Sequence, residues 1–64
     1  MKIICLRTGR TIEKNLSISE ASNAMIERLK TTCQQEKWTQ ENTEKLIKNY
    51  QMYSKNPFMF EVRA

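Results

Sequence analysis

Few residues in this chain carry enzyme chemistry. It has two cysteines, Cys5 and Cys33, seven acidic residues that are all glutamate, and no histidine. Without histidine there is no Cys–His or Ser–His nucleophile pair and no imidazole general base. Two cysteines alone make neither a zinc site nor a disulfide framework. The sequence therefore predicts a protein that is not an enzyme, that binds no metal or cofactor and that has no small-molecule substrate.

The cysteines and one pair of glutamates are the remaining chemical candidates. Cys5 lies in an apolar run, and apolar surroundings raise a thiol pKa and lower its reactivity. We expect both thiols to be small buried side chains in a reducing compartment, although a Cys5–Cys33 disulfide is compatible with the sequence. Glu41 and Glu44 are close enough to chelate a cation on one helix face, but this spacing is ordinary for a solvated surface. The single glycine and the absence of aspartate exclude P-loop and EF-hand motifs.

The charge is uneven along the chain, and this favours one alternative function. Eleven basic and seven acidic residues give a net charge of +4. Residues 1–14 and 45–64 each hold four basic residues and one glutamate, whereas residues 15–44 hold three basic residues and five glutamates. Basic ends suit phosphate contacts. Trp38, Tyr50 and Tyr53 are able to stack on bases, although the helical spacing of the tyrosines favours packing.

Length and hydropathy limit the number of domains and the cellular location that we expect for the protein. Sixty-four residues predict a single domain, residues 1–64, with a small core. The first apolar run stops at Arg7, which is too early for a signal peptide. No stretch approaches the roughly 18 apolar residues of a membrane span. We therefore expect a cytoplasmic protein without membrane contact, and a domain this small usually relies on a staple or a partner.

The segment from Ser17 to Cys33 is the element around which we expect the chain to fold. Ser17 and Glu20 form a capping box, in which each residue hydrogen-bonds the backbone of the other. Apolar residues then recur at steps of three and four, which predicts an amphipathic helix with one buried stripe. The stripe consists of Ile18, Ala21, Met25, Leu29 and Cys33.

A second helix is predicted after a polar connector at residues 34–38. Thr39 is its expected N-cap, and Glu41 suits its first turn. Its apolar face is expected to contain Leu46, Ile47, Tyr50 and Tyr53, and Pro57 to stop it.

Three short segments are predicted to be strands. Residues 2–6 are apolar on both faces, residues 10–14 are charged as an edge strand should be, and residues 58–63 alternate. Gly9 suits the positive φ of a three-residue hairpin loop, which would place Leu6 opposite Arg10 and Ile4 opposite Ile12. The order β-β-α-α-β predicts an α+β fold: a three-stranded antiparallel sheet, with the first strand central and an αα-hairpin on one face.

Apolar surface in excess of what the helices can cover is the main functional clue. We expect the covered face to hold Ile4, Leu6, Ile12, Phe58, Phe60 and Val62. The other face would then present an apolar centre with a charged rim, which is typical of an interface. We predict that the residues of this partner-binding surface are Ile3, Cys5, Arg7, Arg10, Met59, Glu61 and Arg63.

These patterns predict a small non-enzymatic binding protein that occludes or bridges a macromolecular protein partner, or that associates with itself as a homodimer. Its size is typical of small regulators and inhibitors from compact genomes such as those of phages. The alternative is a basic nucleic-acid-binding protein that uses the Lys and Arg residues of the N-terminal hairpin and the C-terminal strand.

Overall fold

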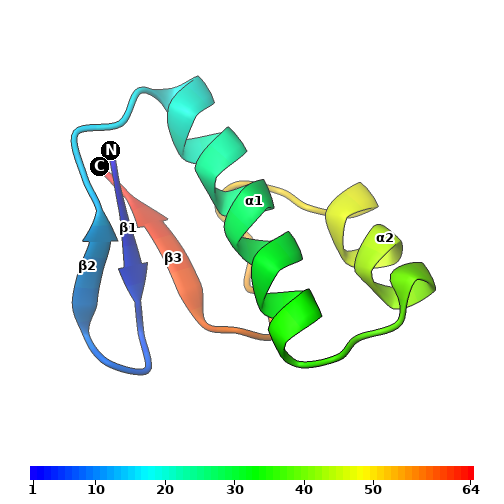
Figure 1. The fold of residues 1–64 in the computed structure, drawn as a ribbon. Coiled ribbons are helices and arrows are strands. Elements are labelled where there is room, and N and C mark those ends of the chain that lie inside the picture. Colours follow the sequence, from blue (N-terminus) through cyan, green and yellow to red (C-terminus); the bar gives the residue numbers. More distant parts are fainter.

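The computed structural model describes all 64 residues as an antiparallel sheet with two helices (Figure 1). The elements are β1 (Lys2–Cys5), β2 (Arg10–Glu13), α1 (Ile18–Gln35), α2 (Gln40–Lys48) and β3 (Phe60–Arg63). The strand order is β2-β1-β3. This confirms the predicted α+β fold, the order of its elements and the central position of the first strand.

Helix α1 begins where the capping box predicted. The Ser17 hydroxyl accepts a hydrogen bond from the Glu20 N–H at 3.1 Å, and the Glu20 carboxylate accepts one from the Ser17 N–H at 2.9 Å. The buried residues of the helix recur every four positions: Ala21, Met25, Leu29 and Cys33. The fifth predicted member of the stripe, Ile18, is 68% exposed. The first turn of α1 therefore extends past the surface that covers the other four residues of the stripe.

Helix α1 is followed by a residue that has the left-handed conformation although it is not glycine. Lys37 has φ +58°. The Trp38 N–H donates back to the Cys33 carbonyl at 2.9 Å, and the Lys37 N–H donates to the Gln34 carbonyl at 3.1 Å. This is the Schellman pattern, which satisfies the last carbonyls of the helix. The chain turns sharply at this motif, and α2 follows.

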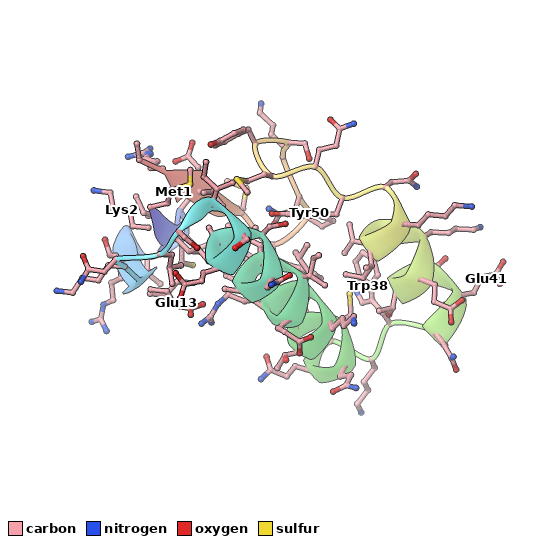
Figure 2. All side chains as sticks on the ribbon, turned by 90° about the horizontal axis from the view of Figure 1, so that it is seen from above. Met1, Lys2, Glu13, Trp38, Glu41 and Tyr50 are labelled. Carbon is pink, nitrogen blue, oxygen red and sulfur yellow. The ribbon has the colours of Figure 1, made fainter.

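Helix α2 is capped by Thr39, whose hydroxyl accepts the Asn42 N–H at 3.2 Å. The helix has no buried residue, and it packs on α1 through the half-buried Leu46 and Ile47. Figure 2 shows the sheet, α1 and α2 in succession from one side of the molecule to the other. Helix α1 alone therefore covers the sheet, and α2 rests on α1.

The predicted apolar face of α2 is wrong beyond Lys48. Asn49 caps the helix there, and the Tyr50 N–H turns back to the Ile47 carbonyl at 3.2 Å. Asparagine favours such cap positions because its side chain competes for backbone groups. Tyr50 consequently packs into the core from a loop, and Tyr53 is 71% exposed.

The hairpin register differs from the prediction by one residue near the turn. Arg10 lies opposite Cys5 and Thr11 opposite Ile4, and a bulge then places Glu13 opposite Ile3. The Cys5 carbonyl accepts the Gly9 N–H at 2.8 Å, so the turn closes on Cys5 and the loop has four residues. Gly9 has the expected positive φ, +72°.

The assignment of β1 faces was reversed. Residues directly opposite each other in an antiparallel pair share a face, and Ile3 lies opposite Val62. Val62 points towards the helices as predicted, so Ile3 does too, and Ile3 is completely buried. Ile4 is on the outer face, where its neighbours leave it 7% exposed. Leu6, predicted to be covered, is 42% exposed.

Two clusters of buried side chains stabilise the fold. The strand–helix core joins the sheet to the first half of α1 and consists of Ile3, Ala21, Met25 and Val62. The helix–helix core joins the second half of α1 to the segment before β3 and consists of Leu29, Cys33 and Phe58. Half-buried Tyr50 and Phe60 contact both cores. Helix α1 is the only element with buried members in both cores.

Candidate binding surface

Asn56 fixes the conformation of the chain before β3. Its side-chain oxygen accepts the N–H groups of Phe58 (3.1 Å) and Phe60 (3.2 Å), and its amide donates to the Phe60 carbonyl at 2.8 Å. Met59, between the two phenylalanines, has φ +63°. Both aromatic rings turn inwards, as the alternation of the sequence predicted, and Met59 remains outside, 46% exposed.

Three large apolar side chains are exposed around this segment. Leu6, Tyr53 and Met59 line a groove of about 250 Å³ at the end of the sheet where the hairpin turns. The backbone joins two of them, because the Leu6 N–H donates to the Met59 carbonyl at 2.9 Å. The remaining residues that line the groove are Ser54, Lys55, Asn56, Phe60 and Glu61. We call this the hairpin-end groove.

The predicted partner-binding residues separate into three groups. Met59 and Glu61 line the hairpin-end groove, and Arg63 lies beside it, with its Nε 2.6 Å from a Glu61 carboxylate oxygen. Arg7 and Arg10 are exposed on the hairpin. The other two, Ile3 and Cys5, were assigned to the wrong face.

Neither Ile3 nor Cys5 belongs to the outer surface of the sheet. Ile3 has no exposed surface with which to contact a partner. Cys5 lies opposite Phe60 and shares its face, which is the side of the helices. The correction moves the apolar centre of the surface from these two residues to Leu6.

Sequence reasoning missed six of the eight lining residues of the groove, among them Leu6, Tyr53 and Lys55. Leu6 was placed in the core by the wrong register, and Tyr53 was placed on a helix that ends earlier. Lys55 had no pattern to indicate a role. The turn-forming Ser-Lys-Asn-Pro sequence at residues 54–57 was the available signal, since it predicts a loop next to the third strand.

The two thiols have different surroundings and are both free. Cys33 is completely buried in the helix–helix core. Cys5 is half-buried at the start of the hairpin loop, where hydrogen bonds from the Thr8 backbone N–H and then the Thr8 side chain lower the pKa of the Cys5 thiol. No general base or acid lies beside the thiol. Cys5 therefore has the lowered thiol pKa of a nucleophile but lacks the partner groups that catalysis needs.

Two other polar regions lie on the surface of the molecule. The Arg28 guanidinium lies 3.4 Å from the Glu13 carboxylate and its carbon is 5.8 Å from the centre of the Phe60 ring, which ties α1 to the sheet. A wider groove of about 630 Å³ runs between α1 and α2, and six of its eight lining residues are polar or charged. Trp38 in that groove packs against Phe58, with ring centres 5.3 Å apart. Packing therefore explains the positions of the Arg28 and Trp38 side chains.

Comparisons with protein-family models, with curated proteins and with solved structures gave no match. Neither helix is both long and apolar enough to cross a bilayer. No group of three cysteine or glutamate side chains is arranged to hold a metal ion. Arguments about function therefore rest on the geometry of the hairpin-end groove and on the charges around it.

Proposed function

We propose that this chain is a small non-enzymatic binding protein that acts by occluding or bridging a protein partner through the hairpin-end groove. The observation that carries the proposal is the exposure of Leu6, Met59 and Tyr53, which are 42%, 46% and 71% exposed around one groove. Clustered exposed apolar side chains with a polar rim are typical of interaction sites.

The backbone at Met59 supports the same proposal. A residue other than glycine, asparagine or aspartate rarely adopts the left-handed conformation, and holding it there costs about 1–3 kcal/mol. Such strain is concentrated at functional positions. Here the strained residue presents a flexible apolar side chain, which adapts well to a partner surface.

The test compares groove variants with a matched variant elsewhere. Leu6→Glu and Met59→Asn should keep the circular dichroism spectrum, because both side chains are outside the core, and asparagine tolerates the left-handed conformation of residue 59. Both should abolish capture of a cross-linked partner from the native host. Ile18→Glu is the control, since Ile18 is equally apolar and 68% exposed but lies at the start of α1. If every captured protein is retained by both groove variants, the groove is not the interface.

Nucleic-acid binding remains the second candidate because of one feature of the sheet. Lys2 and Arg63 lie opposite each other on β1 and β3, and Arg7 and Arg10 are exposed on the hairpin. Phosphates would relieve the repulsion between such like charges. Replacing Arg7 and Arg10 by alanine should then weaken binding equally for unrelated sequences and flatten its salt dependence. Absence of binding to any nucleic acid at low salt would remove this candidate.

A further inference from the structure

We infer that the occupant of the hairpin-end groove is an acidic protein segment, in which one or two large apolar side chains are flanked by carboxylates. This inference rests on the proposed function and specifies the chemistry of the partner. It follows from the charges that surround the apolar lining of the groove.

The rim of the groove is basic. Lys55 lines it, and Arg7 directly follows Leu6 in the exposed hairpin loop. The only acidic residue in the lining, Glu61, is already in contact with Arg63 at 2.6 Å. With Glu61 and Arg63 paired to each other, Lys55 and the exposed Arg7 are the basic residues here without an acidic partner.

One further unpaired basic residue, Lys2, lies on the outer face of the sheet. Lys2 lies opposite Arg63 on this face, whereas Arg63 itself is paired with Glu61, which lies opposite Ile4 on the same face. Carboxylates that flank an apolar anchor would meet unpaired opposite charge at Lys55 and Arg7. Such rim pairs steer association and select the partner.

A second copy of the chain is a poor occupant for the same reason. Two such faces brought together would place Lys55 and Arg7 of one copy near the basic residues of the other, and like-charge contacts are unfavourable. Nucleic acid satisfies the charge but leaves the apolar lining unused, since phosphates do not bury leucine or methionine side chains. An acidic apolar segment alone matches both properties of the groove.

The test uses three synthetic peptides of equal length with the isotope-labelled protein. The first has leucines at helical spacing between glutamates, the second has lysines in place of the glutamates, and the third has serines in place of the leucines. The leucine–glutamate peptide should shift the backbone amide signals of Leu6, Tyr53 and Met59. The other two should bind at least about tenfold more weakly, because each lacks one of the two properties.

Charge reversal at the rim supplies the matched variants. Lys55→Glu should weaken binding of the leucine–glutamate peptide about fivefold. Lys14→Glu makes the same change in net charge beyond β2, at the opposite end of the sheet from the hairpin turn, and should alter binding less than about twofold.

Three results would overturn the inference. If the leucine–lysine peptide binds as tightly as the leucine–glutamate peptide, the acidic chemistry is wrong while the groove remains a binding site. If no peptide of either charge shifts the groove signals, the proposed function falls together with the inference. If a mixed-sequence DNA duplex shifts these signals and the peptides do not, the occupant is nucleic acid.

Discussion

The two cores of this protein are closed in different ways. The strand–helix core lies between a hydrogen-bonded sheet and α1, and two of its four members come from paired strands. The helix–helix core is covered by α2, which contributes no buried residue, and by aromatic side chains from irregular segments. Regular backbone pairing supports burial in the strand–helix core. Burial in the helix–helix core depends instead on a few helix caps and on Asn56.

This difference predicts which half of the molecule determines global stability. Local openings involve segments with few buried contacts, and they cost less free energy than global unfolding. We expect α2 and residues 49–59 to open before the sheet does. The following substitutions test this from the largest expected effect to the smallest.

The largest effect is expected at the centre of the strand–helix core. Ile3→Ala should destabilise the fold by about 3 kcal/mol, because it leaves a cavity between β1 and α1. The whole free energy of unfolding for a chain of this length is roughly 3–10 kcal/mol, so a loss of this size should lower the melting temperature strongly in circular dichroism. Ile4→Ala, on the outer face, is the control and should cost about 1–2 kcal/mol. Equal losses would mean that α1 does not distinguish the two faces.

The next effect is expected at the side chain that positions the helix–helix core. Asn56→Ala removes three hydrogen bonds to Phe58 and Phe60 and should cost about 2 kcal/mol in a urea titration. Asn56→Asp keeps the acceptor for the two N–H groups but places a carboxylate against the Phe60 carbonyl, so it should recover only part of the loss. Asn23→Ala, at an exposed position of α1, is the control. A loss at residue 56 no greater than at residue 23 would contradict the role of Asn56.

A smaller loss of stability is expected when either N-cap is replaced. Whether the loss is global or confined to α2 distinguishes the two regions. Ser17→Ala should lower global stability by about 1 kcal/mol, because α1 spans both cores. Thr39→Ala should instead increase amide exchange within α2 and lower the melting temperature less. If Thr39→Ala lowers the melting temperature more than Ser17→Ala, the two regions unfold as one unit and the comparison fails.

The capping box also predicts a pH dependence. The Ser17 N–H, and then its hydroxyl, hydrogen-bond the Glu20 carboxylate and lower the pKa of Glu20. A carboxyl whose pKa is lower in the folded state stabilises the fold above its unfolded pKa, and this contribution disappears as the pH falls through the folded value. The melting temperature of wild type should therefore fall towards that of Glu20→Gln under acidic conditions. A constant difference between them from neutral to acidic pH would contradict this.

The smallest effect is expected at the connection between the helices, and it has the opposite sign. Lys37→Gly should stabilise by about 0.5 kcal/mol, because glycine adopts the left-handed conformation without a steric penalty. Lys30→Gly, the same change within α1, should destabilise by about 1 kcal/mol. Chemical denaturation of both variants measures the difference. Destabilisation by both would show that residue 37 is not strained.

The elements that follow a local rule could be predicted from the sequence. The capping box at Ser17, the four-residue period of α1 and the cap at Thr39 each depend on neighbouring residues, and all three are present. The central position of β1 followed from its apolar composition. The positive φ of Gly9 followed from its lack of a side chain.

The faces of β1 could not be predicted in the same way. Isoleucines at positions 3 and 4 make both faces apolar, so alternation shows only that they point apart. The choice depends on which residue lies opposite Val62, and the pairing of β1 with β3, which are far apart in the sequence, determines that. The groove was partly missed for a related reason. Its shape depends on hydrogen bonds of the Asn56 side chain, and the Asn-Pro sequence had indicated only a helix stop.

The pairing of β1 with β3 has a consequence for synthesis on the ribosome. Lys2 lies opposite Arg63 and Cys5 opposite Phe60, so the central strand needs a partner made roughly 55 residues later. At about 5–20 residues per second, that partner is made some 3–11 seconds after β1. During this interval β1 can pair only with β2, and its other edge stays open. The nascent chain therefore carries an unsatisfied strand edge until translation reaches the last strand, and crowding between neighbouring nascent chains is most hazardous in that interval.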